Sequence, residues 1–375
     1  MSTETGAQAW PVKELDGWLP TTASIIIDNY NYAAFLGEAI ESALNQTHDA
    51  QVIVVDDGSK DNSRDVIAAY GKRVEAIYKE NGGQASAFNA GFRRASGDVI
   101  FFLDSDDMLE PGTVEAVLNA WREGTVMVHH PMLIIDSKGR PWGEIPDPNL
   151  GLADGDVRSL LLNEGTYPTT VTSGLAFARP ALAKVMPMPE KDFIYSADGY
   201  LVHALPFFGR VQRVNGRLGK YRTHGGNATD AWSDPGGYAA GFRRKISYSL
   251  NEIETVRKFA REFSLTPSAD IGEGDPDFLG YRLFSIILDP RSHPIPHDRK
   301  FGLLFKYIAR RWKSSWSLRR RVSTIIFPLF AAFASPSAAA KLIHTMSDSA
   351  AQPEWLSALS KWLRRRQKKG PATAA

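Results

Sequence analysis

The strongest constraint on the fold is a regular alternation of short apolar runs and amphipathic segments between residues 23 and 128. The apolar runs are "ASIII" (23–27), "QVIVVDD" (51–57), "VEAIY" (74–78) and "DVIFFLD" (98–104), and their composition favours strands covered on both faces. Between them, "YAAFLGEAIESALNQ", "SRDVIAAYG" and "QASAFNAGFRRAS" have apolar residues at helical spacing. The alternation predicts βαβ units, and so an α/β fold with a mainly parallel sheet flanked by helices.

The alternation becomes less regular beyond residue 130, where a long amphipathic helix is predicted at 241–263. The stretch "DPRSHPIPHD" (289–298) is rich in proline and is typical of a linker. We expect five parts: a lead-in at 1–22, two halves of an α/β domain at 23–130 and 131–235, a helical extension at 236–290, and a basic amphipathic tail at 291–375.

Charge is distributed unevenly along the chain. From Lys300 onward there are 15 Lys and Arg and 2 acids, a net +13, which leaves −11 for the preceding residues because the whole chain carries +2. A basic tail on an acidic body indicates that the tail meets an anionic partner. The chain has no cysteine, which excludes disulfides and thiolate metal sites, and its N-terminus lacks the pattern of a signal peptide. We therefore expect a cytoplasmic protein.

Polar turns follow all four predicted strands. The strands lead into "DNYN" (28–31), "DDGSKDNS" (56–63), "KENGGQ" (79–84) and "DSDD" (104–107). The carboxyl ends of parallel strands lie at one edge of a sheet, where ligands of open α/β proteins bind. The four turns together therefore predict a binding site at this edge.

The acidic turn after the fourth strand has the form Asp-x-Asp, at Asp104 and Asp106, followed by Asp107. Crowded carboxylates are costly unless a cation neutralises them, and Mg²⁺ or Mn²⁺ prefers such oxygen ligands. The acids could instead favour the N-terminus of a helix that begins near Pro111. Both interpretations stay open on this motif alone.

Two further motifs have both a binding and a structural interpretation. In "VVDDGSKDNS" (54–63), a carboxylate could accept a hydrogen bond from a nucleobase, or the acids could cap the next helix. In "NGGQASAFNAGF" (81–92), the helix N-terminus could offer unpaired N–H groups to an anion, or the small residues could serve close packing. The motif matches neither a Walker A loop nor a G-x-G-x-x-G fingerprint.

The four motifs, in this order and spacing, resemble the family 2 glycosyltransferases, which have the GT-A fold. The resemblance covers residues 23 to about 125, and it departs from the family at Asp28 and Asn29, where Pro-Thr is usual before the Tyr-Asn pair. It implies a nucleotide-sugar-binding half at 23–130 and an acceptor-binding half at 131–235. It implies contacts with the nucleotide-sugar by Asp28, Tyr30, Asp57, Asn81, Gly82 and Asp104, and binding of Mg²⁺ or Mn²⁺ by Asp106.

The resemblance also implies a catalytic base and a second metal ligand. Asp198, in "YSADGYLVHAL", matches the carboxylate that takes the proton of the acceptor hydroxyl in an inverting transfer. Ala197 stands where an acid is common, and Asp198 could instead be a helix N-terminal acid. His224, in "YRTHGGN", matches a histidine that reaches the metal or the diphosphate, although a lone histidine is often structural.

The tail mixes basic and aromatic residues in "FGLLFKYIARRWKSSWSLRRRVSTIIFPLFAAFA" (301–334) and "PEWLSALSKWLRRRQKKG" (353–370). Basic amphipathic helices with tryptophan are typical of segments that lie on an anionic bilayer. We expect peripheral attachment to the inner face of the plasma membrane; the alternatives are a helix packed on the catalytic domain or partial disorder. No nucleic-acid motif is present.

Together these features predict a metal-dependent inverting glycosyltransferase of envelope or exopolysaccharide synthesis. We expect a nucleotide-diphospho-sugar donor, with UDP favoured, and a glycan or lipid-linked glycan acceptor. The sequence leaves two alternatives: an enzyme for GDP-mannose or polyprenyl phosphate, and a catalytically silent membrane-bound scaffold. The sugar, the acceptor and the linkage depend on loops after residue 130.

Overall fold

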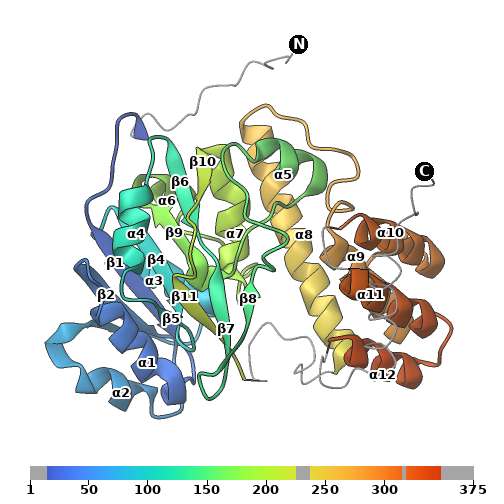
Figure 1. The fold of residues 1–375 in the computed structure, drawn as a ribbon, viewed down its shortest axis with the longest axis horizontal. Coiled ribbons are helices and arrows are strands. Elements are labelled where there is room, and N and C mark those ends of the chain that lie inside the picture. The colour runs from blue at the N-terminus through green and yellow to red at the C-terminus, as the bar shows by residue number, and fades with distance from the viewer. Residues whose placement is uncertain (1–14, 225–236, 315–317, 348–375) are drawn as a thin grey trace, which may run out of the picture. The chain divides into compact units, whose positions relative to one another are not determined.

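The computed structural model describes residues 15–224, 237–314 and 318–347 (Figure 1). These residues form two compact units, the first built from 15–224 and 248–272 and the second from 237–247 and 273–347. The long helix α8 (Tyr238–Glu262) contributes residues to both units.

The first unit contains a seven-stranded sheet in the order β10-β6-β9-β4-β1-β2-β3. Its strands are β1 (Ala23–Asn29), β2 (Ala50–Asp56), β3 (Glu75–Tyr78), β4 (Val99–Asp104), β6 (Thr125–His129), β9 (Leu175–Ala178) and β10 (Arg210–Arg213). Neighbouring strands are parallel except at β9, which runs antiparallel to β4 and to β6. The predicted α/β architecture with a mainly parallel sheet is confirmed.

Helices cover this sheet as the alternation in the sequence predicts. They are α1 (Ala33–Leu44), α2 (Ser63–Ala69), α3 (Gln84–Phe92), α4 (Thr113–Ala120), α5 (Arg158–Glu164), α6 (Arg179–Val185) and α7 (Ala197–Ala204). In α3, the ring of Phe88 stacks on that of Phe102 at 3.9 Å, and Gly91 lies against the side chain of Ile26. The small residues of α3 therefore bring its backbone close to the centre of the sheet.

The register of the parallel strands sets the geometry of the sheet edge. Asp28 on β1 is the register partner of Asp104 on β4, and Asn29 is the partner of Asp56 on β2. Register partners on adjacent strands point to the same face. The polar residues at the strand ends are therefore neighbours in space.

A second, four-stranded sheet lies in the same unit, in the order β5-β11-β7-β8. Its strands are β5 (Met108–Leu109), β7 (Met132–Asp136), β8 (Pro141–Ile145) and β11 (Gly219–Thr223). β5 follows the Asp-x-Asp turn directly and pairs with β11. This pairing brings the residues after β11 to the acidic turn.

The second unit is helical and contains α9 (Pro276–Leu288), α10 (Lys300–Lys313), α11 (Leu318–Ala331) and α12 (Pro336–Ser347). Its apolar core includes Leu283 of α9, Leu304 and Tyr307 of α10, and Ile343 of α12. In the described part of the chain, no helix is long and apolar enough to cross a membrane. The predicted helical C-terminal region is confirmed for these residues, whereas the motif at 353–370 lies outside them.

The proline-rich stretch between α9 and α10 is non-helical but firmly held. Asp298 is buried and accepts hydrogen bonds from Arg282 Nε at 2.9 Å and from His293 Nε2, also at 2.9 Å. The other ring nitrogen of His293 lies 3.1 Å from the hydroxyl of Ser285. The buried ion pair ties this segment to α9 within the second unit.

Candidate active site

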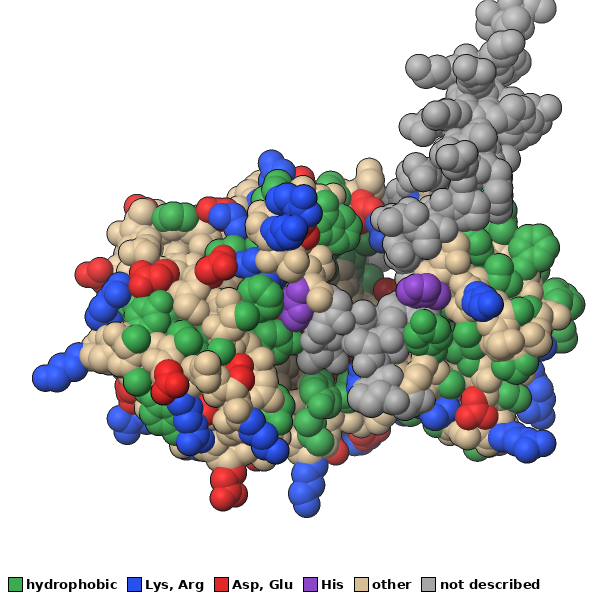
Figure 2. Space-filling view, turned by 90° about the horizontal axis from the view of Figure 1, so that it is seen from below, with side chains coloured by type: hydrophobic (Ala, Val, Ile, Leu, Met, Phe, Trp, Pro, Cys, Tyr) green, Lys and Arg blue, Asp and Glu red, His purple; other side chains and the backbone are tan. Residues whose placement is uncertain are grey.

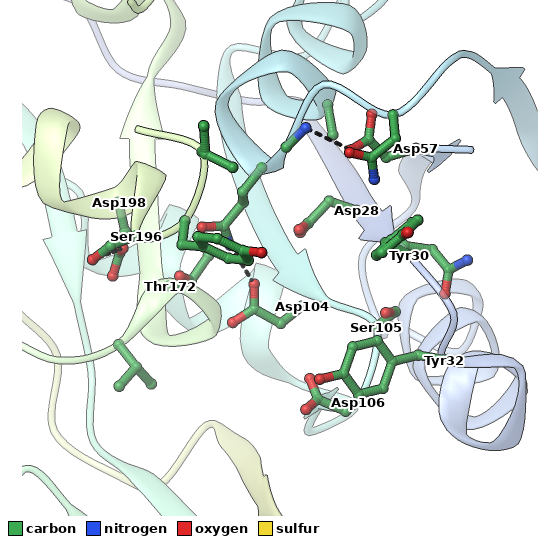
Figure 3. Close-up of a pocket in the computed structure, with 18 of the residues that line it drawn as sticks. Asp28, Tyr30, Tyr32, Asp57, Asp104, Ser105, Asp106, Thr172, Ser196 and Asp198 are labelled. Atoms are coloured by element: carbon green, nitrogen blue, oxygen red, sulfur yellow. Dashed lines mark hydrogen bonds between the residues drawn. The ribbon is translucent and has the colours of Figure 1, made fainter. Parts of the chain in front are cut away.

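A pocket of about 400 Å³ opens at the carboxyl ends of β1, β2 and β4 (Figure 3). Seven of the predicted site residues line it: Asp28, Tyr30, Asp57, Asn81, Asp104, Asp106 and Asp198. The other two are hydrogen-bonded to lining residues, because Gly82 N donates to Asp57 Oδ1 at 3.0 Å and His224 Nε2 lies 3.0 Å from Asp106 Oδ2. The structure therefore brings all nine predicted residues together at one site.

Figure 3 shows how the labelled residues are distributed around the pocket. Asp198 and Ser196 lie on one side, Tyr30 and Asp57 on the other, and Asp104 between them. Tyr30 is 41% exposed, so its ring is accessible to a ligand. This arrangement separates a side lined by β1 and β2 from a side lined by the start of α7.

Asp28 and Asp104 form a pair of adjacent carboxyl groups. Burial, together with the charge of Asp106, raises the pKa of Asp28 to about 8. Burial also raises the pKa of Asp104 well above its usual range, with the charge of Asp28 as the next cause. Asp28 Oδ1 is buried and has no hydrogen-bond partner among the described residues.

Asp106 and His224 face each other at the end of β11. Both side chains are mostly buried, and the imidazole packs against the rings of Phe35 at 4.9 Å and Tyr32 at 5.4 Å. A carboxylate oxygen and an imidazole nitrogen are both acceptable ligands for an ion such as Mn²⁺. The structure therefore places the two predicted metal ligands side by side.

Asp107 has a different environment. Its Oδ1 accepts a hydrogen bond from Arg222 N at 2.8 Å, which fastens β11 to the acidic turn. Burial and the charge of Asp106 raise the pKa of Asp107 well above its usual range. Asp107 does not line the pocket, and its contact with β11 gives it a positioning role.

Arg222 is a cation at this site that the motifs did not single out. Its side chain is almost fully buried, donates to Glu38 Oε2 at 2.7 Å and to the backbone oxygen of Asp106 at 2.9 Å, and lies over the Phe35 ring. Because the guanidinium donates to the backbone oxygen of Asp106, it helps to fix the turn. In the sequence, Arg222 looks like any basic residue of a strand. Its burial at the site becomes visible only when β11 pairs with β5 after the acidic turn.

The two acids after β2 are both engaged by the chain itself. Asp56 is fully buried and accepts hydrogen bonds from Asn29 Nδ2 at 3.2 Å and Arg64 Nε at 3.1 Å. Asp57 accepts from Gly83 N at 2.7 Å and from Gly82 N, and it is paired with Lys79. Asp56 therefore serves the fold, and Asp57 shapes the glycine loop beside the pocket that it lines.

The glycine loop does not present its helix N-terminus to a ligand. The N–H groups of Gln84 and Ala85 donate to the carbonyls of Ile194 at 2.7 Å and Phe193 at 3.2 Å. The first turn of α3 therefore holds the segment before α7. One interpretation of the motif is that this helix terminus offers unpaired N–H groups to an anion. At Gln84 and Ala85 it does not, because both N–H groups are hydrogen-bonded within the chain.

Gln84 is a second residue that the motif analysis did not assign. Its side-chain Nε2 donates to Asp104 Oδ1 at 2.9 Å, while its Oε1 accepts from Ala197 N, also at 2.9 Å. One amide thus joins an acid of the Asp-x-Asp turn to the residue next to Asp198. Sequence spacing gives no signal for this contact, because 113 positions separate Gln84 from Ala197.

Asp198 is the second residue of α7 and faces the pocket. Burial raises its pKa, and hydrogen bonds from Gly199 and Thr172 oppose that shift. Ser196, just before the helix, has a left-handed backbone with φ of 60°. The carboxyl group is therefore held at the pocket wall with a raised proton affinity, which suits a general base.

The residues at this site fit a divalent cation that has other ligands as well. No group of three or more acidic or histidine side chains within residues 15–224, 237–314 and 318–347 is placed to hold an ion alone. Mg²⁺ commonly binds through one or two carboxylates and completes its shell with water and substrate phosphates. Asp106 and His224 provide two donors, and the unpartnered Asp28 oxygen indicates that positive charge is lacking.

Comparison with known proteins gives several matches. A 213-residue region, 54% of this chain, is 38% identical to an uncharacterized glycosyltransferase of Nostoc sp.. Identity is 42% over 107 residues with the minor teichoic acid biosynthesis protein GgaB of Bacillus subtilis, and 48% over 99 residues with chondroitin synthase of Pasteurella multocida. The chain covers 65%, 12% and 10% of these three proteins, which is less than two thirds of each.

Two solved structures show a looser similarity. Staphylococcus aureus TarS 1–349 in complex with UDP aligns with 87% of this chain and 91% of its own, at 14% identity and a TM-score of 0.46. The mannosyltransferase PcManGT of Pyrobaculum calidifontis, in complex with GDP-Man and Mn²⁺, aligns with 91% of this chain and 89% of its own, at 16% identity and a TM-score of 0.46.

The family comparison agrees with the position of the pocket. The sequence profile described as glycosyl transferase family 2 matches residues 24–176. This range contains β1 to β4, the turns that follow them, and the pocket residues from Asp28 to Thr172. Residues 24–176 of this chain are therefore similar to glycosyl transferase family 2.

Proposed function

We propose that this chain is a metal-dependent, inverting glycosyltransferase that moves a sugar from a nucleotide-diphospho-sugar to a hydroxyl acceptor. The observation that carries this proposal is the pocket itself, in which acids from the ends of β1 and β4 lie opposite Asp198 in a chain similar to family 2. The donor lies along the β1 and β2 side, and the acceptor enters on the α7 side.

The donor nucleotide is held by residues at the strand ends. Tyr30 stacks on the base, and Asp28, Asp57 and Asn81 line the nucleotide side of the pocket. Asp57 can act while paired with the glycine loop, because an ionised carboxylate has about four acceptor positions. Its bonds to Gly82 and Gly83 also keep the loop in place before the donor binds.

Asp106 and His224 would hold the divalent cation, and Asp104 would lie beside the donor. When bound, the cation would supply Lewis-acid stabilisation of the negative charge that develops on the diphosphate. Without that charge, burial and repulsion keep the pKa of Asp104 raised, so its carboxylate is disfavoured. Cation and carboxylates therefore stabilise each other in the loaded site.

Asp198 performs the proton transfer. Its carboxylate takes the proton of the acceptor hydroxyl, whose oxygen forms a bond to the anomeric carbon. The bond from that carbon to the diphosphate breaks, and its electron pair leaves with the nucleoside diphosphate. Attack on the face opposite the leaving group inverts the anomeric centre. The burial that raises the pKa of Asp198 strengthens it as a base.

The donor is proposed to be a UDP-sugar. The alternative donor is GDP-mannose. The acceptor is proposed to be a glycan or lipid-linked glycan of the cell envelope, or an exopolysaccharide. The names of two relatives, a minor teichoic acid biosynthesis protein and a chondroitin synthase, support a polysaccharide acceptor. Polyprenyl phosphate is the alternative acceptor, and a non-catalytic scaffold is the alternative to an enzyme.

Donor turnover tests this function. Purified protein is incubated with a panel of UDP- and GDP-sugars, with Mn²⁺ or with EDTA, and release of the nucleoside diphosphate is measured. We expect turnover with one donor, its loss in EDTA and in Asp106→Ala, and retained nucleotide binding without turnover in Asp198→Asn. A protein that neither turns over nor shows metal-dependent nucleotide binding would be the scaffold.

The cellular site is proposed to be the cytoplasmic face of the plasma membrane, with peripheral attachment through residues 291–375. The surplus of basic residues from Lys300 onward supports this placement. Nucleic acid is not proposed as a partner.

A further inference from the structure

Helix α10 has apolar side chains on two separate faces. Leu303, Leu304 and Tyr307 are buried in the core of the second unit. Phe301, Phe305 and Trp312 repeat at a spacing of four and seven residues, so they lie on one stripe of the helix, and all three are exposed. Phe305 is 75% exposed. Packing within the second unit therefore explains only one of the two apolar faces.

The exposed face continues at the end of α11. Phe333 is 72% exposed, and its ring lies 5.5 Å from that of Phe301. Leu329 and Phe330 are exposed next to it in sequence. We call these six side chains the α10–α11 surface: Phe301, Phe305, Trp312, Leu329, Phe330 and Phe333. Figure 2 shows hydrophobic side chains with Lys and Arg among them on the visible surface of the second unit.

The surroundings of this surface are exclusively basic along the chain. Residues 300–347 contain nine Lys and Arg and no acid. On α10, Lys306, Arg310 and Lys313 are exposed on a third face, between the far edge of the aromatic stripe and the buried face, and Lys306 is paired with Glu273. The guanidinium of Arg321 lies over the ring of Trp312. Aromatic side chains are thus flanked by cations that can reach outward on flexible stems.

We propose that the α10–α11 surface lies on an anionic bilayer, with its aromatic side chains inserted at the level of the lipid headgroups. A clustered set of exposed aromatic residues marks an interaction site. Exposed phenylalanine and tryptophan beside Lys and Arg are the pattern of interfacial helices, whose binding combines apolar burial with attraction to anionic lipids. This inference rests on the membrane attachment proposed above and specifies the side chains that make it, but it does not depend on the glycosyl transfer.

Charge favours a lipid surface over the other occupants. Lys306 is paired with Glu273 and the buried Arg311 with Asp277, but residues 300–347 still carry a surplus of basic side chains. A second copy that presented the same surface would bring the same surplus against this one, which is unfavourable. An anionic bilayer instead offers many phosphates in one plane and so matches the surplus of positive charge. The surface matches that partner in both its apolar and its charged parts.

Co-sedimentation of the full chain with vesicles tests the proposal. The vesicles contain phosphatidylcholine alone or phosphatidylcholine with phosphatidylglycerol. We expect binding to the anionic vesicles only, weakened about tenfold or more in Phe301→Ser/Phe305→Ser, because two apolar side chains no longer insert. Arg310→Gln/Lys313→Gln is expected to weaken binding by roughly tenfold and to reduce its dependence on salt.

A matched control replaces two apolar residues of similar exposure in the first unit. Leu19 is 62% exposed and Trp142 is 61% exposed, and Leu19→Ser/Trp142→Ser is expected to bind vesicles as the wild type does. Thermal unfolding followed by circular dichroism verifies that each variant folds. If the double phenylalanine variant is unfolded, Phe305→Ser alone takes its place, because Phe305 is the more exposed of the two.

Three outcomes would overturn the proposal. Absence of binding to anionic vesicles excludes a lipid partner. Undiminished binding of the phenylalanine variants assigns attachment to another part of the basic tail. A dimer of the wild type that dissociates in these variants makes a second copy the occupant. None of these outcomes affects donor turnover, so failure here is separate from failure of the proposed glycosyl transfer, whereas absence of binding would also exclude the proposed attachment through residues 291–375.

Discussion

Gln84 offers the most discriminating test of how the two sides of the pocket are connected. Its amide donates to Asp104 Oδ1 and accepts from Ala197 N, beside Asp198. Gln84→Leu removes both bonds, whereas Gln84→Glu keeps an acceptor for Ala197 N and places a like charge against Asp104. The two variants therefore separate the effect on Asp104 from the effect on α7.

The magnitude follows from the hydrogen bond to Asp104. A bond to a charged group is worth roughly 1.5–3 kcal/mol, and about 1.4 kcal/mol corresponds to one pH unit. Loss of this donor disfavours the carboxylate, so a higher pH is needed to ionise Asp104. We expect the acidic limb of the pH profile for metal-dependent donor turnover to move up by about one pH unit or more in both variants.

Gln46 provides a matched control outside the pocket. Its amide bridges the carbonyls of Ser42 and Glu110, each at 2.9 Å, and accepts from Val114 N at 3.0 Å. Gln46→Leu is expected to lower the free energy of unfolding by about 1–3 kcal/mol and to leave the pH profile unchanged. The reasoning is refuted if the acidic limb of the pH profile in Gln84→Glu stays at its wild-type position. It is also refuted if Gln46→Leu shifts that limb by the same amount.

Two further predictions concern the stability of the unliganded protein. The pKa of Asp28 is raised to about 8 in the folded state, so the native protein binds an extra proton between about pH 4 and 8, and the free energy of unfolding falls as pH rises through this window. Asp28→Asn is expected to reduce that loss, while the raised pKa values of Asp104 and Asp107 maintain part of it. Urea unfolding at pH 5 and pH 9 measures the difference, and an unchanged slope would contradict the prediction. A methyl group in Gly91→Ala would overlap the side chain of Ile26 and is expected to cost about 1–3 kcal/mol. Gly112→Ala, which meets nothing within 4 Å, is expected to cost under about 1 kcal/mol in the same unfolding assay, and equal costs would refute the packing argument.

The central sheet was predictable because its signal is local. The runs around Ile26, Val54 and Phe101 are continuous and apolar, as buried parallel strands require, and the structure has strands at each. Parallel strands align their carboxyl ends, so the fold class placed Asp28 and Asp104 at the same edge of the sheet. Their direct proximity depends on the pairing of β1 with β4, which only the structure shows.

Contacts between distant segments were not predictable in the same way. Arg222 becomes a buried anchor only because β11 pairs with β5 after the acidic turn. Gln84 becomes a bridge only because the segment before α7 docks on α3. The carboxylate of Asp57 accepts a hydrogen bond from the backbone of the glycine loop, a partner that its motif does not specify. Each of these depends on side-chain geometry that no periodicity encodes.

The pairing of Asp106 with His224 has a consequence for the order in which the protein matures. The two residues are 118 positions apart, and they meet only after β11 has joined the second sheet. Contacts of such separation form after the local βαβ units, because closing a long loop costs entropy before any contact rewards it. A growing chain that has finished β1 to β4 therefore carries the acids but not the imidazole. If Asp106 and His224 hold the ion as proposed, its tight capture is deferred until translation has passed residue 224, and metal uptake would report that β11 has joined the second sheet.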